Sequence, residues 1–258
     1  MAEVILEIKD VNRTYYDDDG GKVVALKDIG LSVKQGEFVS FIGASGCGKT
    51  TLIRLIAGLD EPESGKLLLD GKEIVGTSPQ RGYVFQQGGL FPWRTVEGNI
   101  KFGLQVQGKK DKTKVQHYVD LIGLSGFEKS FPHQISGGMA QRVAIARALI
   151  NNPEVLLLDE PMGALDSFTR ADIQDKLLEL RAEHNTTMLL VTHDIDEAIY
   201  LSDRVVIMTP RPGKIQDILE INIAHPRDRG SSEFLTLRKE ILEKLQFASV
   251  APQPEYTI

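Results

Sequence analysis

Residues 37–59 read EFVSFIGASGCGKTTLIRLIAGL, and the middle of this stretch decides the fold. The apolar run FVSFI predicts a short buried strand, and the apolar residues that follow Lys49 recur at helical spacing. Between them, Gly43–Thr50 combines glycines with small residues and ends in Lys-Thr. A strand, a glycine-rich loop and a helix in this order predict a loop that holds a phosphate group at the start of the helix.

Each residue type in this loop has a physical role in nucleotide binding. Glycines allow backbone N–H groups to form a nest around the β-phosphate, Lys49 places a positive charge near the β and γ oxygens, and the Thr50 hydroxyl can ligate Mg²⁺. We interpret Cys47 as a small residue that the loop tolerates, not as a redox group. The residues expected to contact the nucleotide are Gly43, Ala44, Ser45, Gly46, Cys47, Gly48, Lys49, Thr50 and Thr51.

The bulk composition restricts the class of protein. With 258 residues, of which 41% are hydrophobic, the chain can bury a substantial core. A net charge of −6 without a dense Lys/Arg block disfavours a dedicated nucleic-acid binder, so no nucleic-acid partner is expected. The single cysteine excludes a disulfide framework within the chain and fits a reducing compartment. No signal-peptide pattern opens the sequence, and its apolar runs are too short to span a membrane, so a membrane role would require partners.

The pattern of apolar residues changes along the chain. The segments VILEIKDV, VVALKDIGLSV and KLLLDGKEI alternate apolar and polar residues around an Asp70-Gly71 turn signal, which predicts a largely β first third. Residues 95–150 have helical spacing, EVLLLDE and TMLLVTHD are typical of buried parallel strands, and an amphipathic helix is expected over 231–246. The predicted fold class is therefore α/β with a parallel sheet, in which ligands bind beyond the carboxyl ends of the strands.

Ionisable residues end two of the predicted parallel strands. Asp159 and Glu160 close the run EVLLLDE, where an Asp in P-loop enzymes holds Mg²⁺. Glu160 lies one residue further, where a carboxylate beside the γ-phosphate can orient water and accept its proton. His193 closes the next run and is expected to reach the same phosphate. We therefore predict Asp159 as a metal ligand, and Glu160 and His193 as catalytic residues.

The stretch QISGGMAQRVAIAR at residues 134–147 begins a helix in an unusual way. Ser136, Gly137 and Gly138 favour caps and turns, so one interpretation is that they only mark the start of the helix. The other is a phosphate site, because a helix N-terminus offers unpaired N–H groups and glycines let an anion approach the backbone. The local sequence leaves both interpretations open.

With Gly43–Thr50, ISGGMAQRVAIARAL and LLLDEPMGALD in this order, the sequence resembles the ATP-binding subunit of an ABC transporter over nearly its whole length. The resemblance implies a P-loop NTPase core with a parallel sheet, an N-terminal antiparallel β subdomain and a helical subdomain that carries the family's signature motif. It implies one ABC ATPase domain, with the core and β subdomain in residues 1–93 and 151–230, the helical subdomain in 94–150, and a C-terminal helix and tail in 231–258.

The signature motif of that family corresponds to the ISGGM stretch. The resemblance implies that Ser136, Gly137 and Gly138 contact the γ-phosphate of an ATP held by the opposite subunit. One chain has one P-loop and one Ser-Gly-Gly helix start, and a two-fold dimer would pair each with its complement on the other copy. Met139 replaces the usual glutamine, so a contact made by that glutamine side chain is in doubt, while the backbone N–H remains available.

The resemblance also implies roles for residues in other loops. Gln86 in RGYVFQQ is placed like the Q-loop glutamine, which touches Mg²⁺ and the attacking water, although an ordinary polar loop residue is the alternative. Tyr15 in VNRTYY is placed like the aromatic ring that stacks on adenine; Tyr16 is its competitor, and a core aromatic is the alternative for either. Asp166 in GALD resembles the D-loop residue that crosses the dimer interface, and it can cap the following helix at the same time.

Three further segments resemble one sub-family. GGLFPWRTVEGNIKFGLQ, DSFTR and MTPRPGKI are similar to segments of importers of nitrate, taurine and alkanesulfonates. Within the first segment, Trp93 either fills a core or belongs to a region that faces the permease, and the sequence leaves both open. The resemblance implies that the binding protein and the permease, not this chain, select the solute.

The resemblance implies an ATP-hydrolysing subunit that uses ATP and Mg²⁺. Its expected partners are a second copy of itself, two integral-membrane permease subunits and, indirectly, an extracytoplasmic solute-binding protein. The expected location is peripheral, at the cytoplasmic face of the plasma (inner) membrane. The alternatives are the ATPase of an exporter or lipid-trafficking complex and a non-transport ABC ATPase.

Overall fold

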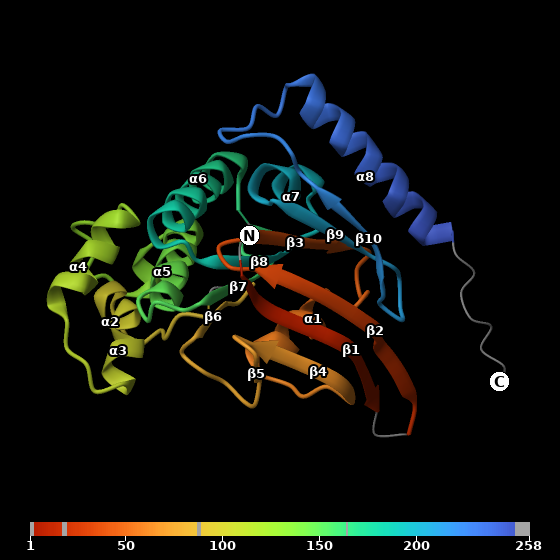
Figure 1. Cartoon of the computed structure of the whole chain (residues 1–258). Helices are drawn as coiled ribbons and strands as arrows, with labels where there is room; N and C mark the ends of the chain where they lie inside the picture. The colour runs from red at the N-terminus through yellow and green to blue at the C-terminus, as the bar shows by residue number, and fades with distance from the viewer. Residues whose placement is uncertain (1–2, 17–19, 87–88, 164, 251–258) are drawn as a thin grey trace.

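The computed structural model describes residues 3–16, 20–86, 89–163 and 165–250, and Figure 1 shows their arrangement. Two β-sheets share a hydrophobic core, and most of the helices surround the larger sheet. No helix in the described ranges is long and apolar enough to cross a membrane.

The N-terminal strands form a four-stranded antiparallel sheet in the order β2-β1-β4-β5. These strands are β1 (Val4–Tyr16), β2 (Lys22–Lys34), β4 (Ser64–Leu69) and β5 (Lys72–Glu73). Asp70 and Gly71 join the last two strands with φ angles of 49° and 70°, as a tight hairpin with left-handed backbone at both positions requires. The prediction of a β-rich first third with a turn at this pair is confirmed.

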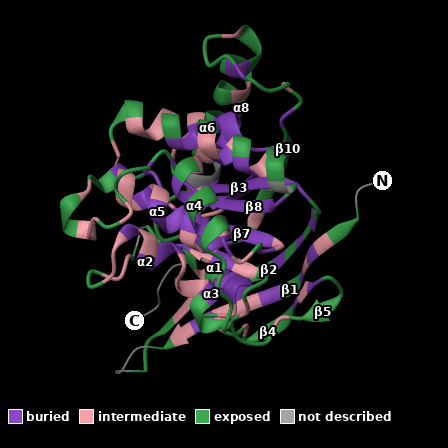
Figure 2. Cartoon of the chain, turned by 90° about the vertical axis from the view of Figure 1, so that its left-hand side faces the viewer, coloured by how far each residue is buried: buried purple, intermediate pink, exposed green. Residues whose placement is uncertain are grey.

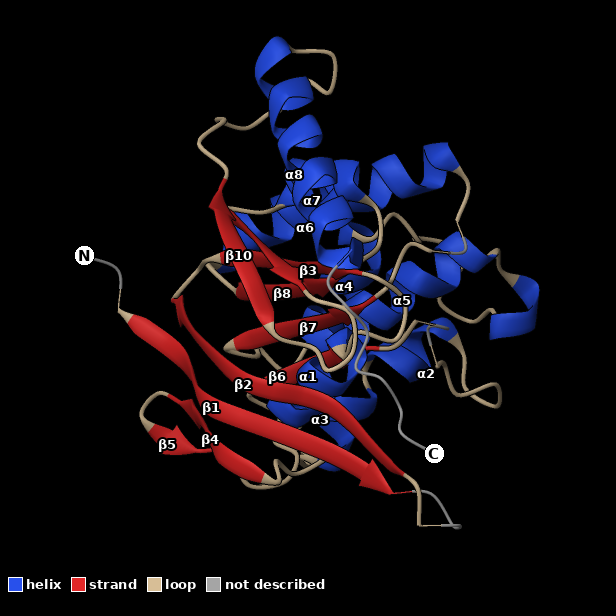
Figure 3. Ribbon diagram, turned by 90° about the vertical axis from the view of Figure 1, so that its right-hand side faces the viewer, coloured by secondary structure: helices blue, strands red, loops and turns tan. Residues whose placement is uncertain are grey.

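The larger sheet has six strands in the order β10-β9-β3-β8-β7-β6, which Figure 3 shows in red. They are β3 (Phe38–Gly43), β6 (Arg81–Val84), β7 (Val155–Asp159), β8 (Thr187–Val191), β9 (Arg204–Met208) and β10 (Ile215–Glu220). Neighbouring strands are parallel except β10, which is antiparallel to β9. Every residue of β7 and β8 is buried, as in parallel strands that are covered on both faces. The predicted α/β class with a parallel sheet is confirmed.

The helices belong to two groups. Helices α1 (Lys49–Ala57), α6 (Ser167–His184), α7 (Ile195–Leu201) and α8 (Ser232–Val250) follow strands of the parallel sheet. Between β6 and β7 lie α2 (Val96–Ile100), α3 (Phe102–Val106), α4 (Lys112–Leu121), the 3₁₀ turn η1 (Pro132–Gln134) and α5 (Gly137–Leu149), gathered at one end of the molecule in Figure 1. This second group is the predicted helical insert.

The boundaries proposed for subdomains stay a prediction, because the helical insert shares one hydrophobic core with the parallel sheet and with α6–α8. The C-terminal helix was expected over 231–246, and the structure extends it to Val250. The expected tail beyond it lies outside the described residues.

The parallel sheet separates two cores, and Figure 2 shows how much of it is buried. Along β3, Val39 and Phe41 point to the core shared with α1 and the antiparallel sheet. Phe38 and Ile42 point to the core shared with the helical insert and α7. Because successive side chains of a strand face opposite sides, this alternation fixes β3 in the middle of the molecule and places the loop that follows it at the sheet edge.

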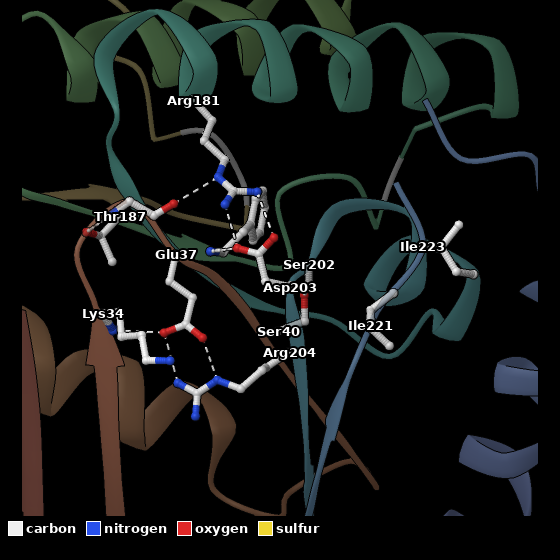
Figure 4. A network of polar contacts seen from close by, with 12 residues as sticks. Lys34, Glu37, Ser40, Arg181, Thr187, Ser202, Asp203, Arg204, Ile221 and Ile223 are labelled. Carbon is white, nitrogen blue, oxygen red and sulfur yellow. Dashed lines mark hydrogen bonds and ion pairs between the residues drawn. The ribbon is translucent and has the colours of Figure 1, made fainter. Parts of the chain in front are cut away.

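Two ion pairs hold the amino ends of β3 and β9, as Figure 4 shows. Arg204 forms two hydrogen bonds to the carboxylate of Glu37, one of them 2.9 Å between Nη2 and Oε2. Arg181 pairs with Asp203, which also accepts a 2.9 Å hydrogen bond from the backbone N–H of Phe38. These contacts fix one end of the strand that carries the glycine-rich loop at its other end.

Candidate functional site

A cavity of about 360 Å³ opens where β3 ends and α1 begins. This is the sheet edge at which the sequence predicts a ligand. The residues that line it are Tyr15, Val23, Ala25, Ser45, Gly46, Gly48, Lys49, Thr50, Thr51, Gln86, Glu160 and Arg211. The structure therefore brings together residues from the first strand, the glycine-rich loop and the ends of β6 and β7.

The loop presents the start of α1 to this cavity. Gly48 is the N-cap of α1 with a φ of 97°, so it has no side chain to cap the helix and the first N–H groups stay available for an anion. A Cβ at Gly48 would lie 2.6 Å from Leu26 Cδ2, so glycine is also required by packing. Lys49 is 6% exposed and its Nζ donates hydrogen bonds to the carbonyls of Gly43 (2.8 Å) and Ala44 (3.1 Å).

Not every predicted loop residue faces the cavity. Gly43, Ala44 and Cys47 are absent from its lining, and the Cys47 side chain is buried at 1% exposure. A Cβ at Gly43 would lie 2.8 Å from the Met208 carbonyl oxygen, which explains the glycine by close packing on β9.

Asp159 is held between two hydroxyl groups. Thr50 Oγ1 donates a 2.9 Å hydrogen bond to Oδ1, and the Tyr83 hydroxyl donates a 2.8 Å hydrogen bond to Oδ2. Burial, followed by the Asp159 carboxylate, raises the pKa of Tyr83, so Tyr83 acts here as a neutral donor. No sequence motif points to Tyr83, which lies three residues before Gln86 on β6, the strand that pairs with β7 in the structure.

The oxygen atoms of Thr50 and Asp159 suit Mg²⁺, which prefers hard oxygen ligands and usually binds through one or two carboxylates plus substrate phosphates. Within the described ranges, no three His, Cys, Asp or Glu side chains gather as a metal site. Gln86, which is also predicted to touch Mg²⁺, lies with its Nε2 3.1 Å from Glu160 Oε2, and its role as a metal ligand stays a prediction.

Glu160 has a backbone conformation that is uncommon for its residue type. Its φ is 44°, whereas the other non-glycine residues with positive φ in the described ranges are all Asp or Asn. Its carboxylate Oε2 lies 3.1 Å from Gln86 Nε2 and 3.5 Å from His193 Nδ1. Glu160 and His193, predicted at the ends of two neighbouring strands, thus meet Gln86 from the loop after β6 at one point, and the uncommon backbone conformation of Glu160 aims its carboxylate there.

The two candidate tyrosines occupy different environments. Tyr15 lines the cavity, and its hydroxyl donates a 2.7 Å hydrogen bond to Asp60 while Arg13 lies over its ring at 4.7 Å. Tyr16 is 65% exposed and does not line the cavity. This geometry favours Tyr15 over its competitor as the residue that meets a base.

Two of the three residues Ser136, Gly137 and Gly138 have structural roles within the chain. Ser136 Oγ accepts a 3.2 Å hydrogen bond from Met139 N–H, so the N-cap interpretation is confirmed. A Cβ at Gly138 would lie 2.2 Å from Thr169 Cγ2 on α6, whereas one at Gly137 would meet nothing within 4 Å. None of the three lines the P-loop cavity, so the phosphate interpretation requires another molecule.

Asp166 caps α6, because its Oδ1 accepts hydrogen bonds from Phe168 N–H (3.1 Å) and Thr169 N–H (3.0 Å). It does not line the P-loop cavity either. The capping interpretation holds, and a role across a dimer interface stays a prediction.

Two arginines lie near the site although no sequence motif points to them. Arg211 lies between β9 and β10 and reaches the loop, with 3.4 Å between its Nε and the Gly46 carbonyl oxygen. Arg170 on α6 connects the segment before Asp166 to the residue after His193. The Arg211–Gly46 contact spans 165 positions and the Arg170–Asp194 contact spans 24, so no local pattern identifies them.

Trp93 is 71% exposed, which shows that the core interpretation is wrong. Its ring packs at 5.6 Å from Phe91, which lines a groove of about 540 Å³ between β6, α3 and α5. Phe85, at 46% exposure, and Phe102 line the same groove. An apolar groove thus lies beside the segment that carries Gln86.

Known proteins match this chain closely. The sequence model of the family described as ABC transporter matches residues 26–163. An aliphatic sulfonates import ATP-binding protein of Bacillus cereus is 48% identical over 245 residues, which cover 95% of this chain and 97% of the relative. A nitrate import ATP-binding protein of Synechocystis is 44% identical over 238 residues, which cover 91% of this chain and 89% of the relative.

A solved structure is also similar in three dimensions. It is the dimeric structure of a post-hydrolysis state of an ATP-binding cassette bound to ADP and Pi, with a TM-score of 0.75, 32% identity, and coverage of 85% of this chain and 100% of that chain. Because the family match, the relatives and the P-loop geometry agree, this chain belongs to the ABC transporter family, as one of its ATP-binding subunits.

Proposed function

We propose that this chain hydrolyses ATP to drive an importer whose solute is a small sulfonate or a related anion. The observation that carries the proposal is the meeting of Glu160 with Gln86 and His193 beside the P-loop cavity. The class of solute follows from the sulfonate and nitrate importers to which the chain is similar.

The residues divide the chemistry among them. The N–H groups at the start of α1 and the Lys49 ammonium bind the phosphate chain, and Tyr15 stacks on the adenine. Glu160 accepts the proton of the attacking water, which Gln86 and His193 orient. A Mg²⁺ ion held by Thr50 and Asp159 would neutralise developing phosphate charge.

The complete site contains two copies of the chain. The residues proposed to meet the ATP of the partner lie outside the cavity of their own chain: Ser136, Gly137, Gly138 and Asp166. ATP then favours the closed dimer because only there does the γ-phosphate touch both chains, and hydrolysis removes this bias. The dimeric cassette structure to which the chain is similar supports this arrangement.

The groove beside Trp93 is the proposed contact with the permease. It is lined by Phe85, Phe91 and Phe102 and lies next to the segment that carries Gln86. A permease segment bound there would sense the γ-phosphate through this glutamine. Two permease subunits would hold two copies of this chain at the cytoplasmic face of the membrane, and a solute-binding protein would act from the other side.

The experiment is reconstitution in liposomes with the cognate permease and binding protein. ATP hydrolysis should rise when the binding protein carries an aliphatic sulfonate, with nitrate and taurine as alternative loads. Glu160→Gln should bind ATP, accumulate as a dimer, and hydrolyse at least about 100-fold more slowly, because it loses a general base. If this variant stayed monomeric with ATP and kept the parent rate, the scheme would be wrong.

A further inference from the structure

The segment between β9 and β10 is a tightly bonded hairpin. Thr209 N–H donates to the Lys214 carbonyl at 2.9 Å, and Lys214 N–H donates to Thr209 Oγ1 at 3.0 Å. Thr209 Oγ1 in turn donates to the Pro212 carbonyl at 3.0 Å. The position of the hairpin tip is therefore set by the fold and requires no ordering when a ligand binds.

The hairpin is also bonded to β2 and packs closely against the nucleotide loop. Gly213 N–H donates to the Ala25 carbonyl and Lys27 N–H donates to the Gly213 carbonyl, each at 2.9 Å. A Cβ at Gly213 would lie 2.0 Å from the Cys47 carbonyl oxygen, so only glycine lets the hairpin approach the loop this closely. The hairpin tip consequently stands at the cavity mouth.

Arg211 occupies this tip. Its side chain lines the cavity, and its guanidinium touches the outer side of the loop at Gly46. It is exposed, and within the described ranges it forms no ion pair with a carboxylate. The 3.4 Å contact with the Gly46 carbonyl is long for a hydrogen bond, so the guanidinium is free to reach a better acceptor.

We propose that Arg211 binds the β- or γ-phosphate of the nucleotide, which makes it a second cationic ligand beside Lys49. The proposal rests on nucleotide binding in this cavity. Among the described lining residues, Lys49 and Arg211 are the cationic ones. A nucleoside triphosphate carries several negative charges, and the single positive charge of Lys49 does not balance them. The planar guanidinium can bind two phosphate oxygens at once, which an ammonium cannot do.

The test compares Arg211→Ala and Arg211→Lys with Lys214→Ala. Lys214 is a matched control, because it carries the same charge on the same hairpin but pairs with Asp28 at 3.8 Å and does not line the cavity. Isothermal titration would give Kd values for ADP and for adenylyl imidodiphosphate, and AMP would be measured by competition. Thermal unfolding without nucleotide would verify that each variant is folded.

We expect Arg211→Ala to weaken ADP or the imido analogue about tenfold, because a charge-assisted hydrogen bond is lost at an exposed site. Arg211→Lys should lose less, Lys214→Ala should match the parent, and the effect should shrink at high salt. AMP affinity should not change. If Arg211→Ala loses affinity for the imido analogue alone, Arg211 binds the γ-phosphate. If it loses affinity for both ADP and the imido analogue, Arg211 binds the β-phosphate.

Three results would overturn the proposal: a parent-like Kd for Arg211→Ala, an equal loss in Lys214→Ala, or an equal loss for AMP. The first excludes the contact, the second indicates only long-range attraction, and the third places Arg211 on the base, the ribose or the α-phosphate. Lys49→Ala separates this test from the proposed function. If the parent bound no nucleotide, or if Lys49→Ala bound it normally, nucleotide binding in the cavity itself would be wrong.

Discussion

The hydroxyl of Tyr83 lies 2.8 Å from Oδ2 of Asp159, on the side of the carboxylate that Thr50 does not occupy. Asp159 is 8% exposed, and each of its carboxylate oxygens accepts a hydrogen bond. The carboxylate is therefore restricted to small rotations. Orientation of a metal-binding carboxylate by such a partner is a common requirement, because the ligand geometry of Mg²⁺ is strict.

Tyr83→Phe should raise the Mg²⁺ concentration needed for half-maximal ATPase activity by roughly tenfold, because Asp159 loses the donor that orients it. It should also destabilise the fold by about 1–3 kcal/mol, since a buried acceptor becomes unsatisfied. Tyr118→Phe is the control, because its hydroxyl donates to the Leu149 carbonyl at 3.1 Å, away from the site. Equal Mg²⁺ requirements in both variants would show that Tyr83 serves stability alone.

Arg170 connects the residue before Asp166 to the residue after His193. Its Nη1 lies 2.8 Å from Asp194 Oδ2 and its Nη2 lies 3.3 Å from the Leu165 carbonyl oxygen. Asp194 follows His193 and caps α7, while Leu165 precedes Asp166. One guanidinium thus joins the backbone before Asp166 to the side chain that follows His193, and it lines a small cavity with Glu160 and His193.

Arg170→Gln should lower the ATPase rate roughly tenfold, because misplacement of His193 affects the transition state, while the Kd for ATP should stay within about twofold of the parent. Arg238→Gln is the matched control, since Arg238 also pairs with a carboxylate of α7, Asp196, at 2.7 Å, but neither residue lines the cavity that Arg170 shares with Glu160 and His193. Steady-state kinetics and nucleotide titration would measure both quantities. A parent-like rate in Arg170→Gln would leave this arginine a structural role only.

The sequence predicted the groups that lie in contiguous motifs and missed those whose partners lie far away. The loop at Gly43–Thr50 and the acids Asp159 and Glu160 at the end of β7 were predicted because each motif stands directly at a strand end. The contact between Tyr83 and Asp159 spans 76 positions, and that between Arg211 and Gly46 spans 165. Such contacts follow from the strand order and from hairpin packing, which apolar periodicity does not determine.

Glu197 makes stability depend on pH. It is 4% exposed at the start of α7, and burial raises its pKa above the ordinary value of 4.5. The folded state therefore holds the Glu197 proton more tightly than the unfolded state. The protonated Glu197 contributes its full share to the free energy of unfolding below pH 4.5, and this contribution is lost as the pH rises through the folded-state pKa. Glu197→Gln should gain stability relative to the parent as pH increases. The measurement is thermal unfolding of both proteins from pH 4.5 upward. A stability difference between Glu197→Gln and the parent that did not change with pH would contradict the raised pKa of Glu197.

The adjacent glycines of the signature should respond differently to alanine. In Gly138→Ala the new Cβ would meet Thr169 Cγ2 at 2.2 Å, and Thr169 cannot turn away freely because its Oγ1 donates a 2.7 Å hydrogen bond to Asp166. We expect the free energy of unfolding of this variant to fall by about 1–3 kcal/mol, the usual cost of overpacking, so that it unfolds at a lower temperature. Gly137→Ala meets open space and should keep or slightly raise stability, since alanine favours helix.

Gly137→Ala nevertheless should lower ATPase activity at least about tenfold if the glycine lets the γ-phosphate of the partner's ATP approach the start of α5. Nucleotide binding to the single chain should remain normal, because Gly137 does not line its own chain's cavity. The measurement is ATP-dependent dimerisation by sedimentation in the Glu160→Gln background, with and without the second substitution. A fully folded Gly137→Ala protein that still dimerises with ATP and hydrolyses it at the parent rate would show that the open start of α5 marks only the beginning of a helix.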